Sequence, residues 1–445
     1  GSRGAALIDE YSDLANHKGL LLYNQQTLAL LIKTAITAIV KGSSAFIAFF
    51  MTLALTRNLS PEQSGLFLLA IAVLSASVIF FRLGLDSVVL RKISALHNEQ
   101  AFRTMTTGLI WVLLACFPFV LLCFLLSDFI SNEVFSKPEF ANVLAVSIWA
   151  LPLIASCMLL AVGFQAFHRV IATSVFQNLG LSSFFLFGFY LLWHLSPEDL
   201  SAVSAAKIYL LSALLIFVTA VYMWHRQING KWGSPQFKNT EIWNSSSTMW
   251  AATSMSLLVQ WSGILMAGVF VVASDIAYLS AAQRTANLTS FVLLVVNMVV
   301  APRYAKLWHE GKLEEIKRLS KWSTRGMVVL VFPVVTVMFV FPQSIMGLFG
   351  EGYEKGAILL SIMAVGQLIN VVTGSVGFLL NMSGHERDFR RVTFFAGPLT
   401  IILSYVLIQQ YGVLGAAVAT AIGLSVQNIG ALFMVKKRLG FWPLG

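Results

Sequence analysis

Long apolar runs limit the fold of this chain more than any other feature of its sequence. A helix that crosses the hydrocarbon core of a bilayer needs about 20 apolar residues, and twelve stretches meet that requirement. Their predicted limits are 34–56, 64–83, 105–126, 141–164, 171–193, 204–224, 247–273, 277–301, 326–348, 356–382, 392–409 and 413–435. Barrel strands would be short alternating segments, which these runs are not. We therefore predict an all-α polytopic membrane protein.

The composition supports this prediction and excludes several classes of protein. Hydrophobic residues make up 57% of the chain and charged residues 11%, whereas a soluble domain carries about 25% charged residues. A soluble enzyme, a nucleic-acid-binding protein and a disordered chain are all excluded. The sequence has no Gly-Lys-Ser/Thr phosphate-binding loop and no Cys/His spacing typical of a metal site. We expect no catalytic residue, metal or bound cofactor.

The positions of lysine and arginine predict the orientation, because loops that face the cytoplasm carry an excess of both. With the N-terminus placed in the cytoplasm, 23 of the 30 fall on the inner side and 4 on the outer side. The outer four are Arg57, Lys137, Lys207 and Lys355. Both termini are therefore expected on the cytoplasmic side, and the net charge of +10 reflects this bias.

The chain also resembles itself across its two halves. Phe135–Phe164 aligns without gaps on Phe349–Phe378, with six identical pairs in thirty positions. Chance and shared hydropathy are the alternative explanation. Since six spans is an even number, the halves would have the same orientation, which is the parallel repeat found in some transporters.

The predicted organisation follows from the spans and this repeat. We expect a cytoplasmic N-terminal tail over 1–33, whose opening Gly1-Ser2 reads as a cloning remnant. A lobe of helices 1–6 would occupy 34–224 and a lobe of helices 7–12 would occupy 247–435. A cytoplasmic linker, 225–246, would join them, and a basic cytoplasmic tail, 436–445, would follow.

The ionisable residues inside the predicted spans are cations. Lys41 lies in the first span and Arg284 in the eighth, while Arg82 lies near the cytoplasmic end of the second. Because a charge at the centre of a spanning helix costs roughly 2.5–3.5 kcal/mol on insertion scales, it normally faces a cavity or a partner. Snorkelling to the cytoplasmic surface is the alternative for Lys41. Cations without buried acids predict an anionic cargo, and arginine suits phosphate or diphosphate through paired hydrogen bonds.

Uncharged polar residues on the same spans predict a wet interior. They are Ser44, Gln260, Gln283, Asn287, Asn297, Gln367 and Asn370. The alternative for each of them is a hydrogen bond that joins neighbouring helices. Trp261, beside Gln260, could stack on a sugar ring or simply pack against other side chains.

Several short motifs, taken in order, resemble those of the polysaccharide-transport flippases. In the first half these are Leu59-Ser60-Pro61-Glu62-Gln63-Ser64-Gly65-Leu66-Phe67 and Phe81-Arg82-Leu83-Gly84-Leu85-Asp86 followed by Leu90-Arg91. In the second half they are Asp275-Ile276-Ala277-Tyr278, Ala301-Pro302-Arg303-Tyr304-Ala305, Leu348-Phe349-Gly350 with Tyr353, and Tyr411-Gly412-Val413-Leu414-Gly415-Ala416-Ala417. This family is the O-antigen branch of the multidrug, oligosaccharidyl-lipid and polysaccharide exporter superfamily.

The resemblance implies a twelve-helix, two-lobe flippase in the bacterial inner membrane. It would move a polyprenyl-diphosphate-linked oligosaccharide from the cytoplasmic to the periplasmic leaflet by alternating access. A proton or sodium gradient is the expected energy source, without a residue to name for it. Membrane lipids, a polysaccharide polymerase and other assembly proteins are the expected partners. Two alternatives stay open: a multidrug exporter of the same fold, and a membrane-embedded polymerase or ligase, against which the short outer loops argue.

Overall fold

The computed structural model describes residues 36–37, 39–40, 42–96, 98–237 and 240–444. These residues form helices and turns, and the described part of the chain contains no β-strand. Residues 42–58 are helical. The helices of the first half that follow are α2 (Pro61–Phe81), α3 (Leu85–Leu96), α4 (Glu99–Leu125), α5 (Ser127–Phe129), η1 (Ile130–Val134), α6 (Phe140–Ser147), α7 (Ala150–Ala166), α8 (Val170–Ser174), η2 (Val175–Leu179), α9 (Gly180–Leu195), η3 (Pro197–Asp199) and α10 (Ala202–Gln227).

The second half has the same all-helical character. Its elements are α11 (Thr240–Phe270), α12 (Ala273–Asn287), α13 (Ser290–His309), α14 (Leu313–Val340), α15 (Pro342–Gly347), η4 (Tyr353–Gly356), α16 (Ala357–Val372), α17 (Val376–Met382), α18 (Glu386–Tyr411) and α19 (Val413–Leu439).

Ten helical segments of the described chain are long and apolar enough to cross a membrane. Seven of them are single helices, and the other three, Val170–Leu195, Ala273–His309 and Tyr353–Met382, each join consecutive elements. The count becomes eleven if α6 and α7, which are bent by 41° relative to each other, form one broken span. The predicted first span, 34–56, includes residues outside the described part of the chain, as do Lys41 and the predicted tail 1–33. The chain is thus an all-helical, multi-pass membrane protein, while the number twelve, the two repeated lobes and the side of each terminus stay predictions.

Local sequence explains where the helices begin and end. Pro61 occupies the first turn of α2, and the Ser60 side chain accepts a hydrogen bond from the Gln63 amide, an N-terminal cap that satisfies a free amide. The predicted span 326–348 extends past α14, which ends at Val340, and a separate short helix starts at Pro342. Proline has no N–H to donate and is tolerated in the first turn of a helix, which is where Pro342 lies.

Several spans are interrupted within the membrane. The break between α12 and α13 falls at Leu288 and Thr289, where hydrogen bonds over three residues replace the regular pattern. A second break separates α16 from α17, with Gly374 in a left-handed conformation at φ +77°. Glycine adopts this conformation without the strain that a Cβ atom would cause.

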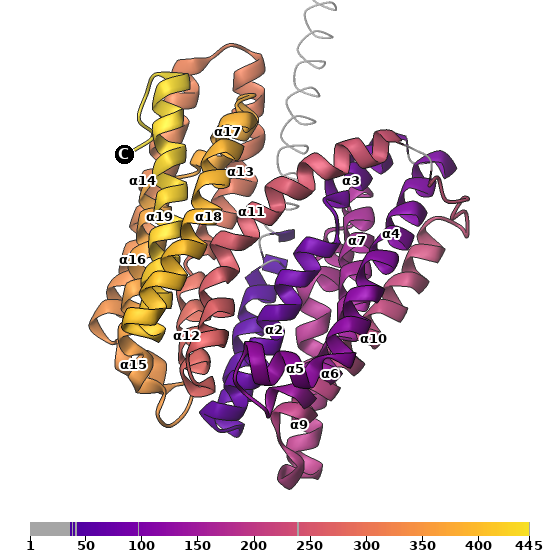
Figure 1. Ribbon diagram of the computed structural model, residues 1–445. Helices are drawn as coiled ribbons and strands as arrows, with labels where there is room; N and C mark the ends of the chain where they lie inside the picture. Colours follow the sequence, from indigo (N-terminus) through magenta and orange to yellow (C-terminus); the bar gives the residue numbers. More distant parts are fainter. Residues whose placement is uncertain (1–35, 38, 41, 97, 238–239, 445) are drawn as a thin grey trace, which may run out of the picture.

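The helices form two groups that meet along a central contact. Figure 1 shows α3–α10 on one side of the molecule and α14–α19 on the other, with α2 and α12 packed together between them. Gly65 of α2 makes this contact possible, since a Cβ atom there would lie 1.7 Å from the Ala273 carbonyl oxygen of α12. Small residues let membrane helices approach backbone to backbone.

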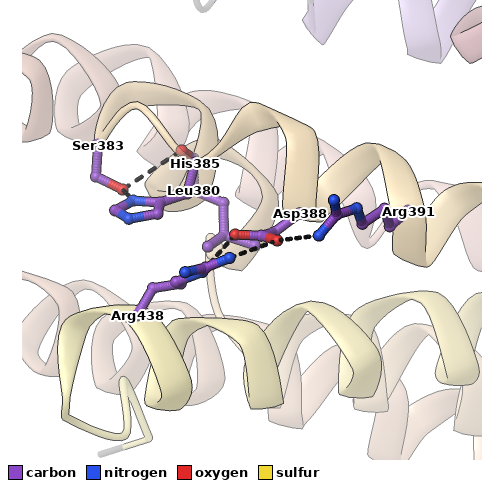
Figure 2. Close-up of polar contacts among 6 residues, drawn as sticks. All are labelled: Leu380, Ser383, His385, Asp388, Arg391 and Arg438. Atoms are coloured by element: carbon purple, nitrogen blue, oxygen red, sulfur yellow. Dashed lines mark hydrogen bonds and ion pairs between the residues drawn. The ribbon is translucent and has the colours of Figure 1, made fainter.

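An ion-pair cluster joins the last two long helices. Asp388 of α18 is buried, and its carboxylate accepts hydrogen bonds from Arg438 Nε at 2.6 Å and Arg438 Nη2 at 3.1 Å (Figure 2). Arg391 Nη1 lies 3.4 Å from the same carboxylate. Paired contacts of this kind between arginine and a carboxylate fix geometry as well as charge, so they hold the start of α18 against the end of α19.

The close approach at Gly65 leads to a stability prediction. We expect Gly65→Ala to lower the midpoint of thermal unfolding in detergent, because the added methyl group forces α2 and α12 apart at a cost of about 1–3 kcal/mol. Gly326→Ala is the matched control, since nothing lies within 4 Å of a Cβ atom at that helical position. Equal melting midpoints for Gly65→Ala and wild type would show that this contact does not limit stability.

Candidate functional site

A cavity of about 680 Å³ lies at the meeting point of both helix groups. Its volume falls within the range of about 300–1,000 Å³ that is usual for ligand pockets. The first half contributes residues from 42–58, α2, η2, α9 and α10, and the second half contributes residues from α11, α12, α13, α16 and α19. Its polar lining residues are Ser75, Asn178, Ser182, Tyr209, Ser256, Gln260, Trp261, Ser280, Gln283, Arg284, Asn287, Ser290, Gln367, Asn370 and Gln427.

Arg284 carries the charge of this cavity. It is the one lysine, arginine, aspartate or glutamate among the described residues that line the cavity. No described carboxylate lies within 4.0 Å of its guanidinium. A charge that stays unpaired in a low-dielectric environment is costly, so the guanidinium depends on water or a ligand in the cavity for its stabilisation.

An amide network forms the wall beside Arg284. Gln367 of α16 donates through Nε2 to Asn287 Oδ1 at 2.9 Å and accepts at Oε1 from the Ser290 hydroxyl at 2.9 Å. Asn370 Nδ2 also donates to Gln367 Oε1, at 3.3 Å. Asn287 and Ser290 flank the break between α12 and α13, so Gln367 ties both sides of the break to α16.

The wall formed by α11 includes two further predicted residues, Gln260 and Trp261. Gln283 Nε2 donates to the Gln260 backbone carbonyl at 3.2 Å, which links α12 to α11. The Gln260 side chain itself forms no hydrogen bond in the described structure, so it can bond to a ligand in the cavity. The indole Nε1 of Trp261 is buried and has no described hydrogen-bond partner.

Seven of the eleven predicted residues therefore line one cavity, and three others that the structure describes, Ser44, Arg82 and Asn297, do not. The seven are Gln260, Trp261, Gln283, Arg284, Asn287, Gln367 and Asn370. Lys41 lies outside the described residues. Ser44 donates its hydroxyl to the Val40 carbonyl at 3.1 Å, one helical turn away, and Asn297 is buried within α13 away from the cavity lining. The Ser44 bond stays within one helix, and Asn297 Oδ1 is buried without a described hydrogen-bond partner, so neither side chain joins neighbouring helices through a described hydrogen bond.

Arg82 lies in a separate, smaller pocket. This pocket has a volume of about 350 Å³ and is lined by Arg82, Asp86, Glu386 and Arg390 among other residues. The Arg82 guanidinium forms an ion pair with Asp86, four residues along the chain, across the turn between α2 and α3. Ser256 of α11 lines both the smaller pocket and the central cavity, so the two spaces adjoin, but the expectation that Arg82 belongs to the central cavity does not hold.

The sequence interpretation missed several polar residues that line the cavity. Tyr209 of α10, Ser182 of α9 and Asn178 of η2 come from the first half, and Gln427 of α19 comes from the second. Each is a single polar group on an apolar helix. The sequence shows that such a residue is polar, but it does not show which neighbouring helix or cavity the side chain faces.

Among the described residues no group of three His, Cys, Asp or Glu side chains could hold a metal ion. The cysteines Cys116, Cys123 and Cys157 are buried and unpaired.

Comparisons with known proteins agree with this architecture. The sequence pattern of the family described as polysaccharide biosynthesis protein matches residues 30–308, and the MatE pattern matches residues 251–406. The chain is 24% identical over 382 residues to a protein of Shigella flexneri named as an O-antigen transporter, covering 83% of this chain and 88% of that one. It is 25% identical over 197 residues to the glycan biosynthesis flippase Agl15 of Haloferax volcanii, which is 44% of this chain and 42% of Agl15.

A solved structure has the same fold. The lipid II flippase MurJ in an inward closed conformation aligns with a TM-score of 0.73 at 14% identity, covering 90% of this chain and 87% of MurJ. Family pattern, relatives and fold together indicate a transporter rather than an enzyme. The chain therefore belongs to the family described as polysaccharide biosynthesis protein.

Proposed function

We propose that this protein moves a polyprenyl-diphosphate-linked oligosaccharide from the cytoplasmic to the periplasmic leaflet of a bacterial inner membrane. The observation that carries the proposal is Arg284, an unpaired cation in a central cavity whose described lining contains no carboxylate. Relatives named as an O-antigen transporter and as a glycan biosynthesis flippase support this class of cargo.

The chemistry of the cavity matches the two parts of such a head group. A guanidinium can donate two parallel hydrogen bonds to phosphate oxygens, which suits Arg284 to the diphosphate. The amide and hydroxyl groups of Gln260, Asn287, Ser290 and Asn370 supply donors and acceptors for sugar hydroxyls. The lipid tail would remain in the bilayer while the head group crosses through the cavity.

Alternating access is the mechanism that we propose for this movement. The cavity is built from both helix groups, so a rocking of one group against the other would expose it to each side of the membrane in turn. We further propose that a proton or sodium gradient drives the cycle and that a polysaccharide polymerase and other assembly proteins receive the cargo.

A multidrug exporter is the second candidate, because the MatE pattern matches 251–406. An exporter of cationic drugs would be favoured by a carboxylate in the cavity, since opposite charges attract strongly at low dielectric. The described lining offers Arg284 instead. The sign of this charge favours an anionic cargo.

Removal of the cavity cation provides the first test. We expect Arg284→Ala to slow flipping by roughly 10- to 100-fold, because a hydrogen bond to a charged group contributes about 1.5–3 kcal/mol. The measurement uses proteoliposomes with a fluorescent polyprenyl-diphosphate disaccharide and a membrane-impermeant quencher, with the native sugar and an ion gradient supplied where needed. Arg284→Lys keeps the charge without the paired hydrogen-bond geometry, so its flipping rate should lie between those of wild type and Arg284→Ala.

The matched control is Arg91→Ala, which removes an exposed arginine of α3 and gives the same net charge. It should flip the substrate at the wild-type rate, and both variants should elute as folded protein. If Arg284→Ala transports at the wild-type rate, Arg284 is not part of the site. If wild type itself transports cationic dyes, the multidrug exporter becomes the better description of the function.

A second test introduces a negative charge beside Arg284. We expect Gln367→Glu to inhibit flipping at neutral pH, because the new carboxylate would offset the charge that attracts the diphosphate. As pH falls the carboxylate gains a proton, so the rate relative to wild type should rise. Arg284 and Tyr209 are the ionisable side chains of the described lining, and neither changes charge between pH 5 and 7 in its ordinary range.

Gln367→Leu separates charge from the loss of the amide network. It removes the hydrogen bonds to Asn287 and Ser290 without adding a charge, so its rate should be reduced severalfold and should not recover at lower pH. Parallel pH profiles for Gln367→Glu and Gln367→Leu would contradict the electrostatic interpretation.

A further inference from the structure

A charged groove of about 530 Å³ lies where α13 ends and α14 begins, remote from the central cavity. Its lining residues are Arg303, Lys306, Leu307, Glu310, Lys312, Glu315, Arg318, Leu319 and Trp322. The groove and the central cavity have no lining residue in common. The groove is therefore not part of the proposed transport site around Arg284.

The charges of the groove do not balance. Lys312 Nζ lies 2.9 Å from Glu310 and 3.8 Å from Glu315, and Lys306 Nζ lies 3.8 Å from Glu310. The hydrogen bond from Lys312 holds the pKa of Glu310 below its ordinary range, so this carboxylate remains ionised as a partner for the lysines. Both acids are thus neutralised within the groove.

Two arginines are left over. Arg303 and Arg318 are exposed, and neither forms an ion pair with any described carboxylate. They come from different helices but line the same groove. Two free guanidinium groups that converge on one groove are suited to the oxygens of a phosphate group.

Trp322 shows at which depth of the membrane the groove lies. Its side chain is 67% exposed, and the Arg325 guanidinium lies 6.0 Å from the centre of its ring. Exposed tryptophans gather at the level of lipid head groups, where an amphipathic ring is partly in water and partly in hydrocarbon. An interfacial position of Trp322 would place Arg303 and Arg318, which line the same groove, near the level of lipid phosphates.

An exposed apolar face continues from Trp322 along α14. Val329 is 69% exposed and Val340 is 60% exposed, and Leu330 and Val337 lie between them on the same side of the helix. Seven residues of helix, from Trp322 to Val329, span about 10 Å at 1.5 Å per residue. The order along α14 is therefore cation, interfacial ring and apolar surface, which is the order of groups along a phospholipid.

We propose that the α13–α14 groove binds the phosphate of an anionic membrane phospholipid, with Arg303 and Arg318 on the phosphate and the acyl chains along the exposed face of α14. Basic pockets between membrane helices on the cytoplasmic side are suited to such head groups. The groove is separate from the proposed transport site, so an experiment can contradict either proposal without affecting the other.

Native mass spectrometry of the full-length protein in detergent tests this proposal. Dioleoyl phosphatidylglycerol and dioleoyl phosphatidylcholine, which share the same chains, are titrated onto wild type and onto Arg303→Gln/Arg318→Gln. We expect phosphatidylglycerol to bind wild type more tightly than phosphatidylcholine. Each basic residue near the membrane surface contributes about 1 kcal/mol, so the double variant should bind the first phosphatidylglycerol about 30-fold more weakly.

The matched control is Arg91→Gln/Arg387→Gln, which removes two exposed arginines elsewhere and changes the net charge equally. Its affinity for phosphatidylglycerol should equal that of wild type. An equal loss in both double variants would mean general charge attraction, and no loss in Arg303→Gln/Arg318→Gln would remove the groove from lipid binding. Displacement of the lipid by millimolar inorganic pyrophosphate would identify a site for free anions instead, which also overturns the proposal.

Discussion

The fold depends on one constraint: a backbone amide in hydrocarbon has no water to bond with and must find its partner in the protein. The described residues meet it with helices alone. Irregular backbone at membrane depth is tolerated where it lines a cavity or is buried in protein, and the break at Leu288 and Thr289 fits this rule. The residues on either side of it, Asn287 and Ser290, line the central cavity.

The same scarcity of water gives the cavity its character. A polar group that is left without a partner in the membrane costs several kcal/mol, and part of the wall avoids this cost through side-chain hydrogen bonds, as Gln367 does with Asn287, Ser290 and Asn370. Other lining groups, such as Ser280 Oγ and Trp261 Nε1, have no described protein partner. Among the described lining residues, Arg284 alone carries a full charge. The protein retains the destabilising group at the place where a ligand of opposite charge would relieve it.

The sequence was sufficient to predict the helical fold and much of the site, for an identifiable reason in each case. Apolar runs of fixed length predict spans because bilayer thickness is fixed, and Arg284 was recognisable because a mid-membrane cation is costly. Tyr209 and Gln427 were missed, since an isolated polar residue can serve either packing or a cavity, and which helices pack together is not encoded in any single span. Arg82 was assigned to the cavity on its charge, although Asp86, four residues along the chain, forms an ion pair with it.

The unpaired state of Arg284 has a consequence for the empty transporter. A water-filled cavity with one positive charge would attract a small mobile anion from solution, so a counterion would neutralise Arg284 before cargo binds. If the cargo is a diphosphate, as proposed, its arrival would expel that counterion, and the entropy of the release would add to the affinity. The apparent affinity for cargo would decline as chloride concentration rises, because displaced anion and incoming phosphate compete for the same guanidinium.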